Sequence, residues 1–143
     1  MKLLKGKWYH YFYGVDRFWE DEVIIYDNGS CEYIYNGEVR EIGKVINQAY
    51  QSTILFEDIK SKKLFSMIFD NQSYKLENAC FTRNIDKQYE KELYLYSIGI
   101  LSRKPIELEV AKNILGDMNK VRMLEENEMV DRLSIYLRDV YLL

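Results

Sequence analysis

Two Asn-Gly dipeptides, Asn28-Gly29 and Asn36-Gly37, interrupt the segment DEVIIYDNGSCEYIYNGEVREIGKV. Asn-Gly between hydrophobic runs is the strongest local signal for a β-hairpin, because both turn residues must adopt a positive φ. Two hairpins that follow each other directly predict a three-stranded antiparallel meander. This segment therefore constrains the fold more than any other part of the chain.

The remainder of the first hundred residues extends the meander. Runs rich in β-branched and aromatic residues are bounded by short polar clusters, and they read GKWYHYFY, YQSTILFE, KLFSMIFD, SYKLENACFTR and KELYLYSIGILS. The single proline of the chain, Pro105, follows all of them, which agrees with strands in the interior of a sheet. About eight strands at regular spacing predict a sandwich or an antiparallel up-and-down barrel.

The hydrophobic period changes after residue 102. The segment SRKPIELEVAKNILG has the Ser and Pro typical of a helix start and the Gly typical of a helix end, with a predicted stripe of Ile106, Val110 and Ile114. A second helix is expected at about 125–141, with a stripe of Val130, Leu133, Leu137 and Val140.

These patterns predict one domain of mainly β structure in an α+β arrangement. With 143 residues, the chain suits a single hydrophobic core. We expect a β-barrel over residues 1–102 and two C-terminal helices in an extension over residues 103–143.

The two-residue turns also allow us to predict which side chains share a face of the meander. Counting outward from each turn places one set of alternating residues together, namely Ile24, Tyr26, Cys31, Tyr33, Tyr35, Arg40 and Ile42. On the other face Glu32 would lie directly opposite Glu41. Because like charges repel across a strand pair, we expect that second face to be outside.

The tyrosine-bearing face would then line the interior. Buried hydroxyl and guanidinium groups need hydrogen-bond partners, so a core that serves packing alone would use aliphatic residues. Tyr33, Tyr35 and Arg40 therefore indicate a polar-lined cavity. In the alternative interpretation, the tyrosines lie on a solvated face and the core receives Val23, Ile34 and Val39.

An acidic cluster surrounds Trp19 and consists of Asp16, Glu20, Asp21 and Glu22. Paired carboxylates can perform acid–base chemistry. Because the cluster falls between two predicted strands, we expect it to form a solvated turn.

The only histidine, His10, shares a face of the first strand with Trp8 and Phe12. No nucleophile or carboxylate lies at a spacing that would make it catalytic, so we expect a hydrogen-bonded histidine that lines the barrel. The opposite face of the same strand needs cover from a helix or a partner, because it carries Tyr9, Tyr11 and Tyr13.

Composition and motifs exclude several functional classes. A net charge of −3 and a pI near 5.3 leave no basic footprint for duplex nucleic acid. No apolar run reaches the roughly 18 residues of a membrane span, and the N-terminus lacks the pattern of a signal peptide.

Chemistry that depends on metals or cofactors is also not expected. The two cysteines, Cys31 and Cys80, indicate reduced thiols in a cytoplasmic protein, and with one histidine they cannot make a zinc site. Neither a glycine-rich phosphate loop nor a Gly-x-Ser-x-Gly motif is present. We therefore expect no cofactor, no metal and no enzymatic activity.

Gly6-Lys7-Trp8 stands at the head of the first predicted strand. The chain resembles lipocalins and related calycin barrels in this motif, in its position near the N-terminus, and in the meander followed by a helix. In that family the tryptophan plugs the closed end of the barrel, and a late arginine packs across the indole. The resemblance implies that Arg83, in the segment CFTRN, takes this place.

The chain is also similar, more faintly, to the small barrel domains that sense cyclic nucleotides in bacterial antiphage signalling. Such a ligand needs aromatic faces for its bases and cations for its phosphates. The resemblance implies non-catalytic binding of a small molecule, in particular a nucleotide-type signal. The candidate ligand-binding residues are Trp8, His10, Tyr33, Tyr35, Arg40, Arg83, Tyr94 and Tyr96.

The alternative function is that of a protein-interaction module. A barrel with a closed, well-packed core would act through its tyrosine-rich surface or through its C-terminal helix. The stripe of Val130, Leu133, Leu137 and Val140 would then form a homodimer contact, whereas packing of the same stripe against the barrel is the competing interpretation.

Overall fold

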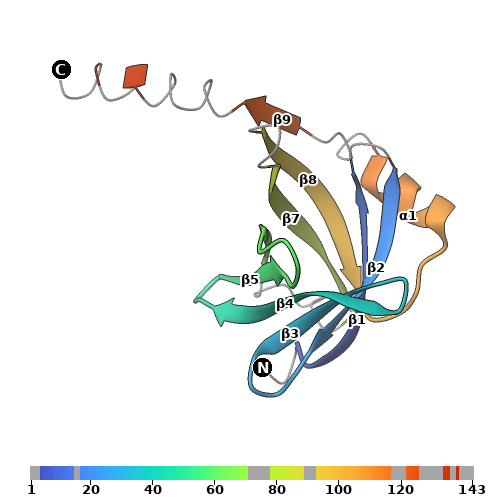
Figure 1. Cartoon of the computed structure of the whole chain (residues 1–143). Helices are drawn as coiled ribbons and strands as arrows, with labels where there is room; N and C mark the ends of the chain where they lie inside the picture. Colours follow the sequence, from blue (N-terminus) through green and yellow to red (C-terminus); the bar gives the residue numbers. More distant parts are fainter. Residues whose placement is uncertain are drawn as a thin grey trace.

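The computed structural model describes residues 4–14, 17–70, 78–88, 93–116 and 122–125, together with residues 134, 135 and 138. Eight antiparallel strands follow one another around a closed barrel, and the eighth pairs back to the first (Figure 1). The strands are β1 (Gly6–Tyr13), β2 (Phe18–Ile25), β3 (Ser30–Tyr35), β4 (Glu38–Asn47), β5 (Gln51–Asp58), β6 (Leu64–Asp70), β7 (Ala79–Gln88) and β8 (Leu93–Ser102). The predicted up-and-down barrel is confirmed.

A short additional strand, β9 (Arg122–Glu125), was not predicted from the sequence. It pairs with residues 93–96 of β8, whereas β1 pairs with residues 99–102 of the same strand. Because β7 occupies the other edge of β8 along its whole length, β1 and β9 share one edge of that strand. The two ends of β8 are therefore held by different partners.

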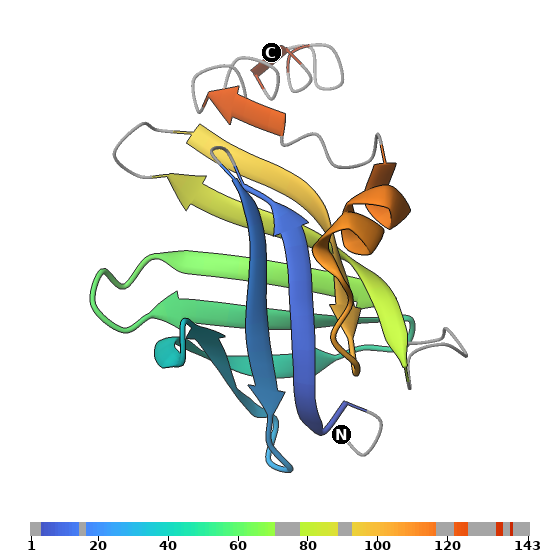
Figure 2. The same ribbon diagram turned by 90° about the vertical axis from the view of Figure 1, so that its right-hand side faces the viewer.

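The helix α1 (Leu108–Leu115) lies against the outside of the barrel (Figures 1 and 2). Its buried residues, Ala111 and Leu115, pack with Tyr11 of β1 and Ile100 of β8. The Tyr11 hydroxyl accepts a hydrogen bond from the backbone N–H of Ile106 at 2.7 Å. This helix and the segment before it provide the cover that the tyrosine face of the first strand requires.

The sequence predicted the wrong buried side for α1, because it placed Val110 and Ile114 in the apolar stripe. Val110 and Ile114 are exposed, and the buried side of the helix is formed by Ala111 and Leu115. Of the predicted stripe, Ile106 alone packs on that side, half-buried and just before the helix. Gly116 does end the helix, with a φ of 53°.

Of the predicted second helix, Ser134, Ile135 and Arg138 are helical. Its proposed contact residues lie outside the described residues, and these are Val130, Leu133, Leu137 and Val140. In the part of the chain that the structure describes, no helix has the length and apolar character needed to cross a membrane.

The first hairpin has a longer connection than the sequence predicts. Its loop comprises residues 26–29, with a backbone hydrogen bond from Tyr26 N–H to Ser30 C=O at 2.9 Å. As a result Ile25 pairs with Cys31, one position away from the predicted partner. Ile24 and Tyr26 therefore leave the predicted inner face.

The second hairpin contains a β-bulge between Tyr33 and Ile34. Tyr35 pairs with Glu38 as predicted, but beyond the bulge Tyr33 pairs with Glu41 and not with Arg40. A bulge places two residues opposite one and turns the following side chains to the other face.

The bulge has two consequences for the predicted faces. The like-charged pair Glu32/Glu41 does not exist, because Glu32 pairs with Ile42. Glu41 lies on the inner face, whereas Arg40 and Ile42 are exposed. The alternative interpretation placed Val23, Ile34 and Val39 in the core. Only Val23 is fully buried, whereas Ile34 is half-buried and Val39 is exposed.

A hydrophobic core fills the half of the barrel around Trp8. Trp8 is fully buried, and its indole N–H donates to the Leu4 carbonyl at 2.7 Å. The core continues through every strand from β2 to β6 and into β8, with Val23, Ile25, Cys31, Val45, Ile54, Phe56, Met67, Phe69 and Leu101. As Figure 2 shows, β1 and β2 cross in front of β5 and β6 on opposite sides of this core.

The arginine that packs on Trp8 is Arg103, so the prediction for Arg83 is wrong. The Arg103 guanidinium carbon lies 3.9 Å from the centre of the indole, and Nη1 donates to the Lys5 carbonyl at 2.6 Å. Arg83 is exposed, with its Nη2 3.5 Å from the side-chain oxygen of Gln51. The cation-over-indole contact exists, but it comes from the chain just beyond β8.

Candidate functional site

The interior of the barrel becomes polar beyond His10. Strand pairing places the inner positions side by side, with His10 opposite Asp21, Tyr33 opposite Glu41 and Asn84 opposite Met67. We call this group the inner polar cluster, and it consists of His10, Asp21, Tyr33, Glu41, Thr82 and Asn84. Gly99 faces the same space, where an added Cβ would lie 2.9 Å from Asn84 Nδ2 and 2.8 Å from Thr82 Oγ1. A glycine at this position leaves room for both polar side chains.

A chain of hydrogen bonds links four members of the cluster. The Tyr33 hydroxyl donates to Asp21 Oδ2 at 2.8 Å. Since its single proton is used there, His10 Nδ1–H donates to the Tyr33 oxygen at 2.9 Å. His10 Nε2 then accepts from the Thr82 hydroxyl at 3.3 Å. With Asp21 ionised, the network places the His10 proton on Nδ1 and orients Tyr33.

His10 is not suited to act as a base. Burial lowers the pKa of His10 to about 3, with a smaller effect of Asn84 in the opposite direction. The ring is therefore neutral at physiological pH. Its role is to hold Tyr33 in place, as expected for a histidine that lines the barrel.

Three buried oxygen atoms of the cluster have no hydrogen-bond partner within the described part of the chain: Asp21 Oδ1, Glu41 Oε2 and Asn84 Oδ1. Asp21 is only 4% exposed and Asn84 only 2%. Buried polar atoms are nearly always paired in folded proteins, and each unpaired one costs about 1–3 kcal/mol. All three atoms are acceptors, so the cluster lacks donors.

The two carboxyl groups of the cluster are hard to ionise. Burial raises the pKa of Asp21 to about 6, opposed by the Tyr33 hydrogen bond and by Arg17. Burial raises the pKa of Glu41 to about 7, and the negative charges of Asp86, Asp58 and Asp21 add to this effect. The inner face thus combines desolvation with mutual repulsion between carboxylates.

Aromatic rings surround the cluster. Phe12 stacks on His10 with a centroid separation of 4.7 Å, and lies 6.3 Å from Trp19 and 6.4 Å from Phe65. Phe65 lies 5.9 Å from Tyr33. We call Phe12, Trp19, Tyr33, Tyr35 and Phe65 the aromatic wall.

Two arginines sit at this end of the barrel, and we call them the rim arginines. The guanidinium carbon of Arg17 lies 3.7 Å from the Trp19 ring centre, and Nη2 donates to the Tyr35 hydroxyl. The guanidinium carbon of Arg40 lies 5.5 Å from the Tyr35 ring centre. Both side chains are exposed, and both lower the pKa of Asp21 through their positive charge.

The structure brings together four of the eight residues predicted for the site, because Trp8 belongs to the hydrophobic core in the other half of the barrel. Trp8, His10 and Tyr33 are buried in the interior, whereas Tyr35 and Arg40 lie at the rim. The other three face outward, because strand pairing alternates them with the inner positions, and they are Arg83, Tyr94 and Tyr96.

Sequence reasoning missed the residues that give the site its charge. Asp21 was assigned to a solvated turn, but it lies within β2 on the same face as Trp19 and Val23. Their spacing of two in FWEDEVII is the signal that could have revealed it. Glu41, Asn84 and Phe65 carry no comparable signal, since their inward direction depends on the bulge and on long-range pairing.

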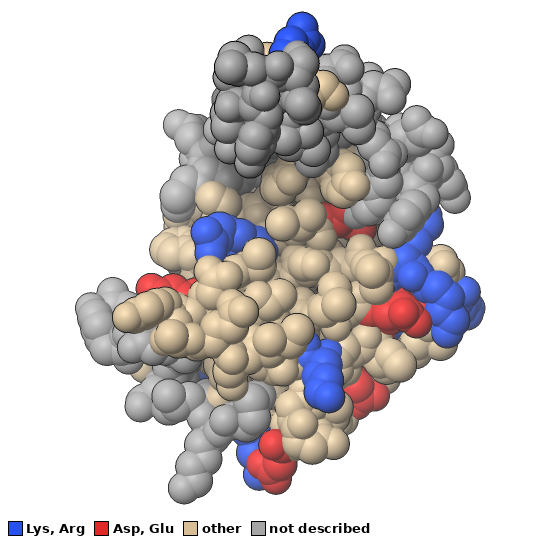
Figure 3. Space-filling view, turned by 90° about the vertical axis from the view of Figure 1, so that its left-hand side faces the viewer, with Lys and Arg blue, Asp and Glu red and all other residues tan. Residues whose placement is uncertain are grey.

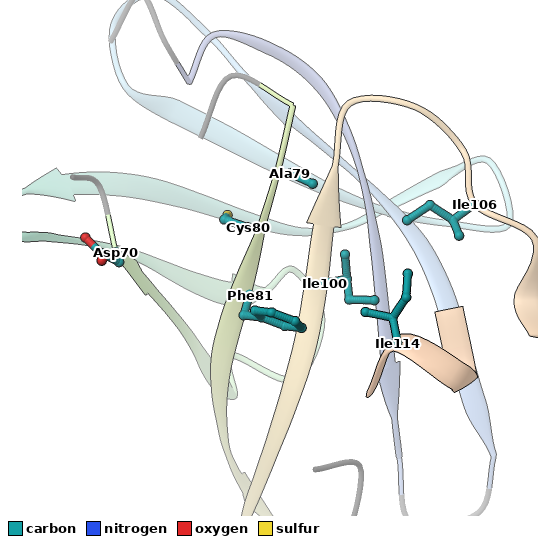
Figure 4. Close-up of a pocket in the computed structure, with 7 residues that line it drawn as sticks. All are labelled: Asp70, Ala79, Cys80, Phe81, Ile100, Ile106 and Ile114. Atoms are coloured by element: carbon teal, nitrogen blue, oxygen red, sulfur yellow. The ribbon is translucent and has the colours of Figure 1, made fainter. Parts of the chain in front are cut away.

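A second feature lies on the outside of the barrel. A groove of about 350 Å³ runs between β7, β8 and α1, with a lining of Asp70, Ala79, Cys80, Phe81, Ile100, Ile106 and Ile114. In Figure 4, Ile100 of β8 and Ile114 of α1 point toward each other, and Phe81 projects from the neighbouring strand. The groove is apolar and contains none of the predicted site residues.

Within the described ranges, no set of three or more His, Cys, Asp or Glu side chains could hold a metal ion. Comparisons with protein-family models, with curated proteins and with solved structures found no match to this chain. The function must therefore be argued from the geometry of the barrel itself.

Proposed function

We propose that this protein is a non-catalytic barrel that binds a small polar molecule in the half of its interior opposite Trp8. One observation carries the proposal: three buried acceptor oxygens of the inner polar cluster lack partners among the residues that the structure describes. They belong to β2, β4 and β7. A ligand that supplies N–H or O–H donors would form hydrogen bonds with all three. It would thereby remove the unfavourable free energy of burying unpaired acceptors, which favours binding.

The aromatic wall supports an organic ligand with a flat or apolar portion. Phe12 and Phe65 flank the polar atoms, and their ring faces can pack against such a group. The neutral state of His10 supports binding without catalysis, because the only histidine does not exchange protons near neutral pH.

A nucleotide-type signal, such as a cyclic nucleotide in antiphage defence, is one ligand class within this proposal. A nucleobase offers both a ring face and N–H donors, and the rim arginines could meet a phosphate outside the aromatic wall. Both cysteines are free thiols, which supports a cytoplasmic location for such a sensor.

The test is to look for a ligand carried by the protein. We expect native mass spectrometry of protein purified from cells to show a bound small molecule, and a matching compound to raise the melting temperature. Asn84→Leu replaces one of the three acceptors with an apolar side chain of similar size. We expect this variant to fold, and the compound that stabilises the parent protein should not raise its melting temperature. Absence of a carried ligand, together with no shift from nucleotides, amines, sugars or fatty acids, would refute the proposal.

The protein-interaction module remains a second candidate, because the outside of the barrel exposes hydrophobic residues. Ile42, Ile46, Leu55 and Leu64 on β4–β6 are exposed, as is Phe81 in the outer groove. Figure 3, which shows the side that lies at the left of Figure 1, has a broad central area without Lys, Arg, Asp or Glu. Of the three β1 tyrosines, Tyr11 is buried under α1 and is not available to such a surface, whereas Tyr9 and Tyr13 are half-buried.

Self-association tests this second candidate separately. If the outer groove joins two copies, sedimentation should show a concentration-dependent dimer that Phe81→Asp converts to a monomer. A monomer at all concentrations for both proteins would remove the groove as a contact between copies.

A further inference from the structure

We infer that the ligand of this barrel carries a positively charged nitrogen group (an ammonium, amidinium or guanidinium) that binds among the carboxylates of the inner face. The inference rests on the proposed function and names the chemical class of its ligand. It differs from a neutral polar ligand in requiring charge as well as donors.

The first argument is the distribution of charge over the inner face. Two strands of the sheet each direct a carboxyl group to this end of the interior, namely Asp21 of β2 and Glu41 of β4, and each keeps one buried oxygen without a partner among the described residues. None of the described inner positions of β1–β8 is Lys or Arg. Within the described ranges, the free oxygens of Asp21 and Glu41 therefore face the interior without a hydrogen-bonded cation.

The second argument is independent of the acidic residues. Asn84 is a neutral side chain that is 2% exposed, yet within the described ranges its carbonyl oxygen also has no partner. Together with Asp21 Oδ1 and Glu41 Oε2 it makes three acceptors that face one interior. Ammonium and amidinium groups carry several N–H donors, and their bonds to carboxylates are roughly twice as strong as neutral ones.

The third argument comes from the rings. Arg17 already places its guanidinium over Trp19 and Arg40 over Tyr35, which shows that the outer members of the aromatic wall accept a cation on their faces. Phe12 belongs to the same wall and stacks on His10, which pairs with Asp21 across β1 and β2, so the wall continues inward to the carboxylates. A cation placed there would gain from rings and carboxylates together.

The rim arginines do not fill this role. Arg17 donates to the Tyr35 hydroxyl, and neither arginine bonds to the free oxygens of Asp21 and Glu41. Their charge stays at the exposed end of the barrel, and none of the described side chains bonds to these two oxygens, which leaves them available to a cationic ligand. A metal ion is a poor candidate, since no described group of ligands could hold one.

The experiment compares probes that share a shape but differ in charge. Benzamidine, benzamide and benzoate would each be titrated into the full chain, with binding followed by nuclear magnetic resonance of backbone amides. We expect benzamidine to shift the amides around Asp21, Glu41 and Asn84, and to bind about tenfold or more tightly than benzamide.

Charge-neutralising variants locate the site. Asp21→Asn and Glu41→Gln should each weaken benzamidine binding about tenfold or more, because each removes a counter-charge while keeping the shape. Glu20→Gln and Glu38→Gln make the same change of net charge at exposed positions, and they should leave binding unchanged.

Three outcomes would overturn the inference. If benzoate or a nucleotide binds at the inner polar cluster and benzamidine does not, the ligand class is wrong while the proposed function stands. Equal binding of benzamidine and benzamide would show that donors suffice without charge. If no probe of any charge perturbs the interior and no ligand is carried from cells, both proposals fail together.

Discussion

The Tyr33 hydroxyl donates to Oδ2 of Asp21 at 2.8 Å and leaves Oδ1 of the same carboxyl group buried without a partner in the described part of the chain. Tyr33 also receives the His10 ring N–H at 2.9 Å. One tyrosine thus holds the carboxyl group from one side and the histidine from the other, so the free oxygen of Asp21 has a fixed position. A ligand that binds to a fixed oxygen loses less free energy to reorganisation.

Tyr33→Phe tests how much this arrangement contributes to stability. The variant removes the hydroxyl while two buried partners remain, so we expect the free energy of unfolding to fall by about 1–3 kcal/mol at neutral pH. Urea denaturation measures the change. Tyr26→Phe is the matched control, because the Tyr26 hydroxyl bonds to Glu32 at the surface, and it should change stability by less than about 0.5 kcal/mol. Equal effects of both variants would contradict the buried network.

The acidic interior predicts an unusual dependence of stability on pH. The pKa of Asp21 is raised to about 6 and that of Glu41 to about 7, above their ordinary values of 3.8 and 4.5. At pH values between the ordinary and the raised pKa of each group, the folded chain binds more protons than the unfolded chain. The contribution of these two groups to the free energy of unfolding is therefore fully present at low pH, and it is lost as the pH rises through 7.

Glu41→Gln should flatten this dependence. Glu41 faces Asp86, Asp58 and Asp21 as well as Arg40, and removing its charge removes the repulsion among the acids. We expect the variant to exceed the parent in stability by on the order of 1 kcal/mol at about pH 8, with the difference vanishing near pH 4. Denaturant titrations at both pH values provide the measurement, and a parent protein that gains stability from pH 5 to 8 would contradict the assignment.

The barrel could be predicted because its signals are local. The Asn-Gly turns and the alternation within each run depend on neighbouring residues only, so strand number and order follow from them. The phase of each strand does not follow so directly. The loop at residues 26–29 and the bulge at Tyr33/Ile34 each move the register by one position, and a one-residue shift exchanges the two faces.

The site was correspondingly harder to predict than the fold. The inward direction of Trp8, His10 and Tyr33 could be predicted because a motif or a local alternation marks it. Asp21 was missed because a run of acids resembles a solvated turn until the closed sheet directs one of them inward. Arg103 was missed because its contact with Trp8 spans almost the whole barrel sequence.

The Trp8–Arg103 contact predicts which late arginine stabilises the hydrophobic half of the barrel around Trp8. Arg103→Ala removes both the stacking on the indole and the bond to the Lys5 carbonyl, so we expect a loss of about 1–2 kcal/mol in the free energy of unfolding. Arg83→Ala, at an exposed position on the outer face, should cost less than about 0.5 kcal/mol. Thermal and urea unfolding followed by circular dichroism would separate the two, and the reverse order would contradict the contact.

Binding of a cationic probe should depend on pH in the opposite direction from apo stability. Benzamidine needs ionised Asp21 and Glu41, whose protonated forms dominate below about pH 6 to 7. The other charged groups that face them are Asp58, Asp86, Arg17 and Arg40, while His10 stays neutral throughout.

We therefore expect the dissociation constant of benzamidine to rise about tenfold or more as the pH falls from about 8 to about 5. Calorimetric titration at each pH would measure it, and binding at neutral pH should release protons to the buffer. Glu41→Gln should reduce both the proton release and the pH dependence, whereas Glu38→Gln should change neither. An affinity that stays constant from pH 8 to pH 5 would mean that the buried carboxylates do not bind the probe.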